Sequence, residues 1–230
     1  MQKIAIMGAM PEEIKPLLER VENLNRVEYA NNSYYEATYK GKELVIAYSK
    51  IGKVFSSLTA STLLDKFGCS TLLFSGVAGA INPNLKIGDL IIANKLCQHD
   101  LDISTFGHAY GFVPEGSIFV DSDERLRLIA KEVALKRGLK VMEGIIATGD
   151  QFVASNERKD FISTHFQADA LEMEGASVAV VCDALNVPFF VLRAISDTAN
   201  DDAVVDFDEF MIGSAKISAN FILDMVESIE

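Results

Sequence analysis

The sequence of 230 residues is 49% hydrophobic and 23% charged, a composition typical of a folded globular protein and not of a disordered chain. Its formal net charge of −12 predicts a surface that repels phosphate backbones and anionic lipid headgroups, so we expect neither a nucleic acid nor a membrane as a partner. The three cysteines, Cys69, Cys97 and Cys182, have no metal-binding spacing and predict reduced thiols in a cytoplasmic protein.

Strands and helices alternate in the first half of the chain. Residues 3–9, KIAIMGA, form an apolar run typical of a buried first strand rather than of a secretion signal. A helix is predicted over 11–24, and Pro16 should make it short or kinked because proline removes a helical hydrogen bond. The next predictions are a hairpin over 33–49, a helix over 53–68, a buried strand over 71–81 that runs into a glycine turn, and a strand over 88–98.

The second half continues this alternation after a long loop, which is predicted over 99–119. The predicted elements are a helix over 122–138, a strand over 143–149, a helix over 156–166, a strand over 169–174, a helix over 175–186, a strand over 188–196 and a final helix from near 206. No repeat or linker divides the chain, so we expect one domain over residues 1–230. The fold class is α/β, with a largely parallel but mixed sheet flanked by helices.

Glycines and acids gather where four of the predicted strands end, in GAMPEE, SGVAG, LEMEG and AISD. In open α/β sheets, ligands bind outside the carboxyl ends of the strands. Each acid alone also fits a helix or turn cap, but acids at several ends of one sheet edge together predict a functional site. Glu172 and Glu174 lie two residues apart and would share one face of a strand.

Two other patterns are weaker. GVAG at 76–79 is not a dinucleotide-binding fingerprint, so a tight turn is the favoured interpretation, although glycine also permits a close approach of the backbone to a ligand. His99, Asp100 and Asp102 lie together without a fourth ligand, which is poor spacing for zinc and favours a hydrogen-bonded loop anchor. We therefore expect no metal and no cofactor.

These motifs resemble a known family. IGKV, GVAGAI, GDQF, EMEG and VLRAISD are similar to the nucleoside phosphorylase/hydrolase superfamily, and GAMPEE matches its 5′-methylthioadenosine/S-adenosylhomocysteine nucleosidase branch. Within the branch, GDQFV, SKIGKVFSSLT and EMEGASVAVVC look most like members that also cleave 6-amino-6-deoxyfutalosine, a menaquinone precursor. The resemblance runs from Ile4 to about Phe210. It implies a twisted mixed sheet, a homodimer, and hydrolysis of the bond between adenine N9 and ribose C1′.

The resemblance also implies roles for individual residues. Asp197 would be the acid that protonates adenine, with Ser196 orienting it, and Glu13 the base that activates water. Glu174 would bind the ribose hydroxyls and stabilise the cationic sugar. The remaining residues implied to contact the small adenine nucleoside are Met10, Ile51, Val77, Ala78, Phe152, Val153, Met173, Arg193, Phe207 and the partner subunit's Phe106. Val77 departs from the serine of many family members, so a side-chain hydroxyl role is lost there.

The chemistry constrains the charges around these residues. Asp197 must hold a proton near neutral pH, so apolar neighbours should raise its pKa, and Arg193 is expected to direct its charge toward Glu174 and the ribose or water instead. Glu172 is left open between a structural hydrogen bond to the backbone and a ligand contact. The carboxylates of GAMPEE favour water over phosphate as the attacking group. The alternatives are a purine nucleoside phosphorylase, a non-catalytic nucleoside-binding protein, and a scaffold whose acids are all caps.

Overall fold

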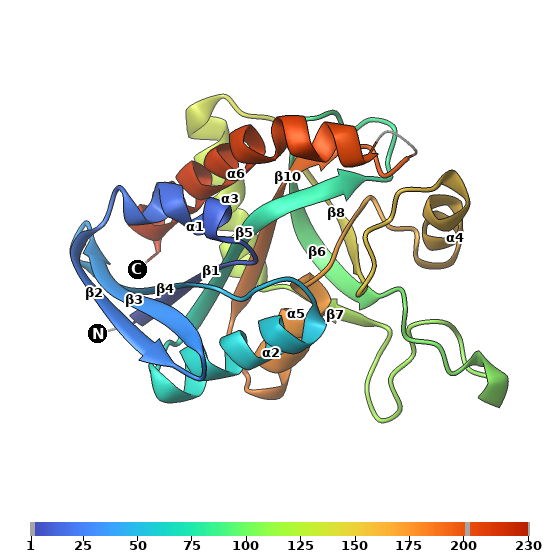
Figure 1. Ribbon diagram of the computed structural model, residues 1–230, viewed down its shortest axis with the longest axis horizontal. Helices are drawn as coiled ribbons and strands as arrows, with labels where there is room; N and C mark the ends of the chain where they lie inside the picture. Colours follow the sequence, from blue (N-terminus) through green and yellow to red (C-terminus); the bar gives the residue numbers. More distant parts are fainter. Residues whose placement is uncertain (1–2, 201–202, 230) are drawn as a thin grey trace.

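A twisted, mixed β-sheet forms the centre of the computed structural model, which describes residues 3–200 and 203–229 (Figure 1). Its strands are β1 Lys3–Gly8, β2 Glu22–Tyr29, β3 Asn32–Tyr39, β4 Lys42–Tyr48, β5 Thr71–Ala80, β6 Leu90–Gln98, β7 Phe119–Asp121, β8 Val141–Thr148, β9 Ala170–Glu172 and β10 Phe189–Asp197. The order is β10-β6-β8-β9-β5-β1-β4-β3-β2, with β7 beside β6. Because β10 also pairs with β5, five of these strands close into a small ring.

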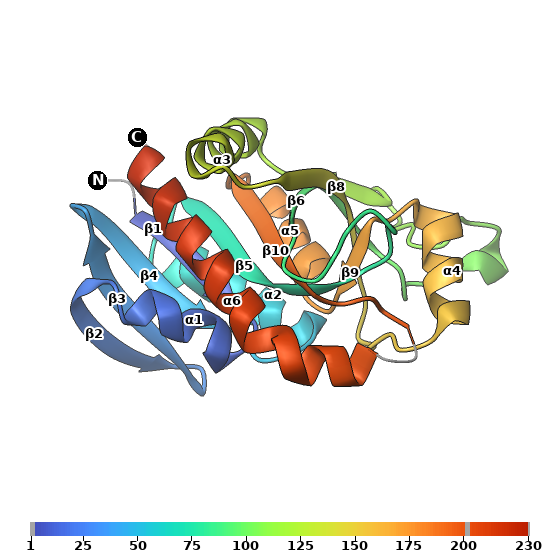
Figure 2. The same ribbon diagram turned by 90° about the horizontal axis from the view of Figure 1, so that it is seen from above.

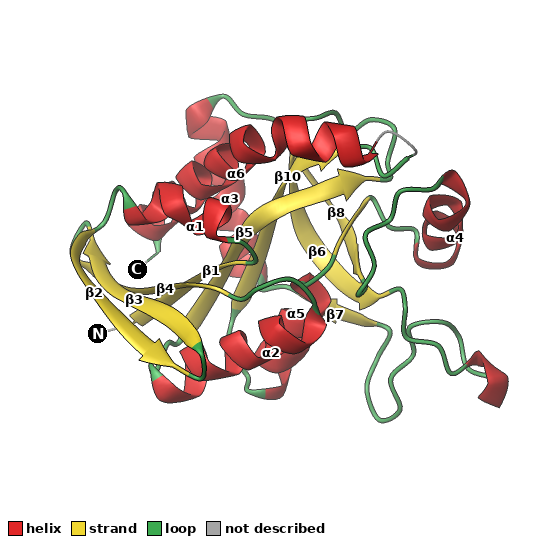
Figure 3. Ribbon diagram, viewed as in Figure 1, coloured by secondary structure: helices red, strands yellow, loops and turns green. Residues whose placement is uncertain are grey.

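Helices cover both faces of the sheet, as the α/β prediction required (Figure 3). They are α1 Pro11–Leu18, α2 Lys53–Ser61 continued by the π-helix η1 Thr62–Lys66, the 3-10 turn η2 Ser104–Phe106, α3 Glu124–Arg137, α4 Asn156–Phe166, α5 Gly175–Ala184 and α6 Ala203–Ser228. Helix α6 lies along the sheet between α1 and α3 (Figure 2), while α2 and α5 pack together on the opposite face.

The alternating side chains of β1 show how the sheet has a hydrophobic core on each of its two faces. Successive strand side chains point to opposite faces, so Ile4 and Ile6 join the core beneath α1, α3 and α6, while Ala5 and Met7 join the core beneath α2 and α5. A third, smaller core lies under α4 at the end of the ring. None of the helices within the described ranges has the length and apolar character needed to cross a membrane.

Several boundaries differ from the predictions. Helix α1 is short, as Pro16 suggested, and residues 22–24, the end of the helix predicted over 11–24, belong to β2 instead. Strand β5 runs straight through the GVAG segment, so the predicted glycine turn is wrong. The loop prediction over 99–119 missed η2 and β7.

The sheet is also less parallel than predicted. Strand β5 runs parallel to β1 and β10 but antiparallel to β9, and β6 runs antiparallel to β10. The ends of β1, β5 and β10 therefore meet at one edge, as expected, whereas β9 reaches the same place from the opposite direction. Its pairing of Leu171 with Gly79 brings the LEMEG segment alongside the last residues of β5.

Candidate active site

A pocket of about 300 Å³ opens where these strand ends converge. Twelve residues implied by the resemblance line it: Met10, Glu13, Ile51, Val77, Ala78, Phe152, Val153, Met173, Glu174, Ser196, Asp197 and Phe207. Five further residues line the pocket: Glu172, whose role was left open, and Ala9, Gly79, Gln151 and Leu171, which the prediction missed. All of these except Leu171 lie next to a predicted site residue in GAMPEE, GVAG, GDQF or EMEG, so those motifs could have predicted them.

Glu13 lies in the first turn of α1 and is almost completely buried. Its Oε2 accepts hydrogen bonds from the backbone nitrogens of Ala9, at 2.5 Å, and Met10, at 3.1 Å, and its Oε1 accepts one from Val77 of β5, at 3.1 Å. Burial raises the pKa of this carboxyl, while the Arg193 charge and the three amides oppose the rise. The carboxylate is thereby fixed between β1 and β5 with one side facing the pocket.

Glu174 is the N-cap of α5, two residues beyond the end of β9. The prediction that Glu172 and Glu174 share a strand face is therefore wrong, because the strand ends at Glu172. The Oε1 atom of Glu174 accepts a hydrogen bond from the Gly52 backbone, at 2.8 Å. Burial, followed by the nearby Glu172 charge, raises the Glu174 pKa to about 8.

Asp197 ends β10, where a β-bulge at Ser196 shifts the pairing register with β5. Bulges re-aim side chains, and here Asp197 comes to lie opposite Gly79. Its Oδ2 accepts from the Ser196 hydroxyl and its Oδ1 from the Ala199 backbone, both at 2.9 Å. Burial raises the pKa of Asp197. The Arg193 guanidinium donates to Glu172 and to the backbone oxygens of Phe74 and Leu192, so it points away from Asp197, as expected.

Glycine is needed in β5 because two carboxylates lie against the strand. A Cβ atom at Gly76 would lie 2.7 Å from Oε1 of Glu13, and one at Gly79 would lie 2.6 Å from Oδ1 of Asp197. Both distances are too short for a side chain to fit without moving the acid. The glycines of GVAG thus permit close approach within a strand and do not form a turn.

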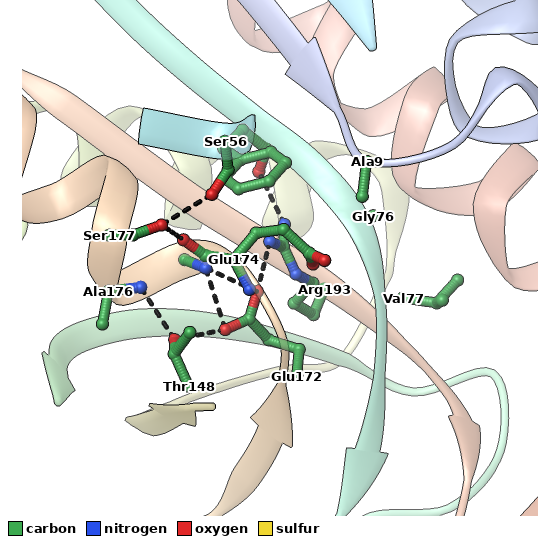
Figure 4. Close-up of polar contacts among 12 residues, drawn as sticks. Ala9, Ser56, Gly76, Val77, Thr148, Glu172, Glu174, Ala176, Ser177 and Arg193 are labelled. Carbon is green, nitrogen blue, oxygen red and sulfur yellow. Dashed lines mark hydrogen bonds and ion pairs between the residues drawn. The ribbon is translucent and has the colours of Figure 1, made fainter. Parts of the chain in front are cut away.

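Arg193 does not pair with Glu174, which corrects the prediction. It lies in the middle of β10, is 1% exposed, and donates from Nη2 to Oε2 of Glu172 at 2.7 Å (Figure 4). Its guanidinium also stacks over the Phe74 ring at 4.0 Å. The Arg193 charge lowers the pKa of both Glu13 and Glu174 through space, but the residue is not part of the pocket lining.

Aromatic residues form the outer part of the pocket. Phe152 and Phe207 meet edge to face, with ring centroids 5.7 Å apart, and Phe152 is 45% exposed. A planar apolar group fits beside such rings. Phe106, by contrast, lies on the protruding 99–119 loop, is 80% exposed and does not line the pocket of its own chain. Its contribution to a partner's pocket stays a prediction.

His99 and Asp100 anchor the loop, as predicted, whereas Asp102 accepts from Ser104 within the loop itself. Asp100 accepts from Lys53 Nζ at 2.6 Å and from the Asp150 backbone at 2.8 Å, tying the loop to α2 and to the segment that precedes Phe152. His99 is buried against Arg158, and burial lowers its pKa to about 4. Across residues 3–200 and 203–229, no cluster of His, Cys, Asp and Glu could hold a metal ion.

Removing the Glu174 charge is expected to stabilise the fold. The raised pKa means that ionising Glu174 costs more free energy in the folded state than in the unfolded state. The free energy of unfolding is therefore unaffected below about pH 4.5 and decreases as the pH rises toward 8. We expect Glu174→Gln, which keeps the acceptor for Gly52, to raise the free energy of unfolding by roughly 1–3 kcal/mol at about pH 9. Urea unfolding at about pH 4 and pH 9 measures this; an equal effect at both values would contradict it.

Comparison with known proteins identifies the class. The family model of the Phosphorylase superfamily matches residues 3–227, and the chain belongs to this superfamily. It is 59% identical over 229 residues to the aminodeoxyfutalosine nucleosidase of Campylobacter jejuni, with 100% of each chain covered. The resemblance inferred from the motifs is confirmed.

Solved structures agree with this placement. The futalosine hydrolase of Helicobacter pylori strain 26695 has a TM-score of 0.97 at 49% identity, covering 99% of this chain and 98% of that chain. The 5′-methylthioadenosine/S-adenosylhomocysteine nucleosidase from Helicobacter pylori with butyl-thio-DADMe-Immucillin-A has a TM-score of 0.98 at 48% identity, covering 100% and 99%. The predicted α/β nucleoside phosphorylase/hydrolase-like fold is therefore confirmed.

Proposed function

We propose that this protein hydrolyses the N-glycosidic bond between adenine N9 and ribose C1′ and releases adenine. Its substrates are 5′-methylthioadenosine, S-adenosylhomocysteine and 6-amino-6-deoxyfutalosine, the last giving it a place in menaquinone synthesis. One observation carries the proposal: three buried carboxylates besides the Arg193-bound Glu172, namely Glu13, Glu174 and Asp197, meet in one pocket whose described lining includes no lysine or arginine. The whole chain, residues 1–230, acts as a single hydrolase domain.

Asp197 supplies the proton for the leaving base. Adenine is a poor leaving group until its ring, normally at N7, is protonated. The raised pKa of Asp197 keeps the acid protonated closer to neutral pH, and the bonds from Ser196 and Ala199 fix its direction. Phe152 stacks on the adenine ring, and the backbone of Val153 pairs with its edge.

Glu13 activates the attacking water. Three backbone amides hold its carboxylate in place, and an oxygen that faces the pocket accepts a proton from water. Glu174 binds the ribose hydroxyls and stabilises the positive charge that develops on the sugar, as paired carboxylates do in glycoside hydrolysis. Met10, Ile51, Val77, Ala78, Met173 and Phe207 line the sugar and 5′-substituent regions.

The charges favour water over phosphate. A phosphate co-substrate needs a cation or a free helix N-terminus to receive it. In the described part of the chain, Arg193 is sequestered by Glu172, and Glu13 presents a carboxylate where phosphate would have to attack. A purine nucleoside phosphorylase is therefore the weaker interpretation, and a non-catalytic binding protein would not need both Glu13 and Asp197.

The direct test is adenine release from 5′-methylthioadenosine, measured with and without phosphate. We expect equal release in both conditions. Release that requires phosphate would contradict the hydrolase, and no release of adenine from any of the three nucleosides would contradict the enzyme. Comparing kcat/KM for the three nucleosides then ranks them.

The two acids predict how the rate depends on pH. Asp197 must be protonated, so the rate falls as the pH rises through its raised pKa, and Glu13 must be ionised, so the rate falls as the pH drops through its own. We expect a bell-shaped profile of kcat/KM between about pH 4 and pH 10. A rate that keeps rising to the basic end would contradict the role of Asp197.

We also propose that the chain is a cytoplasmic homodimer. Exposed apolar side chains gather on α2 and α5, which contact each other, and Val54 of α2 is 76% exposed. A second copy covering this face buries these side chains and brings the partner subunit's Phe106 to the pocket rim. We expect Val54→Glu to give monomers in sedimentation, with a raised KM.

Leu135→Glu is the matched control for the dimer. Leu135 is 81% exposed on α3, on the other face of the sheet, and should tolerate the charge without a change in mass. A Val54→Glu protein that still sediments as a dimer would contradict this interface.

A further inference from the structure

Helix α5 is capped by residues other than its own first residue. Glu174 occupies the N-cap position, yet its side chain makes no capping hydrogen bond. Instead Glu172 accepts from the backbone of Glu174, at 3.1 Å, and of Gly175, at 2.7 and 2.9 Å. The hydroxyl of Thr148 accepts from the backbone of Ala176, at 2.7 Å (Figure 4). The first amides of the helix are thus satisfied from β8 and β9.

The Glu172 carboxylate has no acceptor left for a ligand. Besides the two amides of α5, Oε1 accepts from the Thr148 hydroxyl and Oε2 from Arg193, at 2.7 Å. A carboxylate offers about four acceptor positions, and these contacts fill them. Although Glu172 touches the pocket, it does not bind the sugar, which settles its assignment in favour of the structural hydrogen bonds.

This arrangement leaves the Glu174 side chain free. The side-chain oxygen of a capping N-cap residue, such as aspartate, accepts from the amides of the first turn. Those amides already have partners, so Glu174 extends into the pocket, where its Oε1 accepts a hydrogen bond from the Gly52 backbone. Within residues 3–200 and 203–229 no donor bonds its Oε2, which is therefore available to a ligand hydroxyl.

We propose that Thr148 and Glu172 are positioning residues, which cap α5 in place of Glu174 and so hold the Glu174 carboxylate toward the sugar of a bound nucleoside. Arg193 completes the assembly by fixing Glu172 from β10. That the bound ligand is a nucleoside rests on the proposed function, whereas the capping of α5 by Thr148 and Glu172 does not. Misplacing a catalytic group by about 1 Å can cost roughly 100-fold in rate, so the cap should affect turnover.

The decisive variant is Thr148→Val, which keeps the shape of the buried side chain and removes its hydroxyl. We expect kcat/KM for 5′-methylthioadenosine to fall at least about tenfold. The dissociation constant of free adenine, which lacks the sugar, should stay within about twofold of the original, because Phe152 and Asp197 are untouched. Thr148→Ser restores the hydroxyl and should rescue turnover. Thr62→Val, at a buried threonine of η1, controls for the substitution itself.

Equal losses for the nucleoside and for adenine would overturn the proposal, since a purely structural cap would loosen the whole pocket. An unchanged kcat/KM would overturn it as well. If Thr148→Val does not fold, Glu172→Gln provides the same comparison of nucleoside with adenine.

Hydrogen exchange separates this inference from the proposed function. Thr148→Val should speed amide exchange in the 174–178 segment at least about tenfold relative to Thr148→Ser, whether or not the protein releases adenine. Unchanged exchange would overturn the capping. If the unsubstituted protein releases no adenine, the proposed function is refuted. The amide-exchange result would still test whether Thr148 and Glu172 cap α5.

Discussion

Replacing Asp197 with asparagine is expected to abolish adenine release while leaving nucleoside binding nearly intact. Asparagine keeps an oxygen that can accept from Ser196 or Ala199, so the shape of the site survives, but it has no acidic proton to give. A general acid contributes about 100- to 10,000-fold, and we expect kcat for 5′-methylthioadenosine to fall within that range. Single-turnover adenine release and equilibrium binding together provide the measurement.

Asp123→Asn is the matched control for this change. Asp123 caps α3 by accepting from the Leu126 backbone, and asparagine caps helices as well as aspartate does. Its turnover should be unchanged. An Asp197→Asn protein with near-normal kcat would refute the acid role, and one that loses nucleoside binding in proportion to kcat would show a binding role instead.

Replacing Glu13 with glutamine is expected to have an effect of similar size. The amide cannot take a proton from water, and its NH2 group faces backbone donors that now lack an acceptor. We expect kcat to fall by about 100- to 10,000-fold. The acidic limb of the pH profile should disappear with it, because that limb reports protonation of Glu13.

The neighbouring acid provides the control for Glu13. Glu12 lies in the same turn of α1 but is exposed, so Glu12→Gln changes the local charge without touching the pocket. Its rate should stay within about twofold of the original. If Glu12→Gln and Glu13→Gln lose activity equally, the effect belongs to the helix and not to a catalytic base.

The glycine and acid patterns at strand ends sufficed to predict where the site lies. GAMPEE begins at the end of β1, and GVAG and AISD lie in the last residues of β5 and β10, which are parallel neighbours, so the rule for carboxyl ends applied directly. The same rule did not predict the antiparallel entry of β9, because LEMEG has the same apolar and acidic pattern in either direction. Strand β2 was missed because its side chains are mostly exposed, which leaves no alternation to detect.

The partner of Arg193 was not predictable for a different reason. Three acids compete for one buried cation, and the outcome depends on the register between β9, β5 and β10. That register places Glu172, and not Glu174, beside the guanidinium. Long-range pairing of this kind has no local sequence signature, whereas the burial that raises the Asp197 pKa follows from the apolar run before it.

The most direct test of the central claim follows the oxygen that attacks the sugar. 5′-Methylthioadenosine is incubated with the protein in heavy-oxygen water (H₂¹⁸O) containing phosphate, and the sugar product is examined by mass spectrometry. Water activated by Glu13 predicts one heavy oxygen on the released methylthioribose and no sugar phosphate. A methylthioribose phosphate without heavy oxygen would contradict hydrolysis and the role of Glu13 in it.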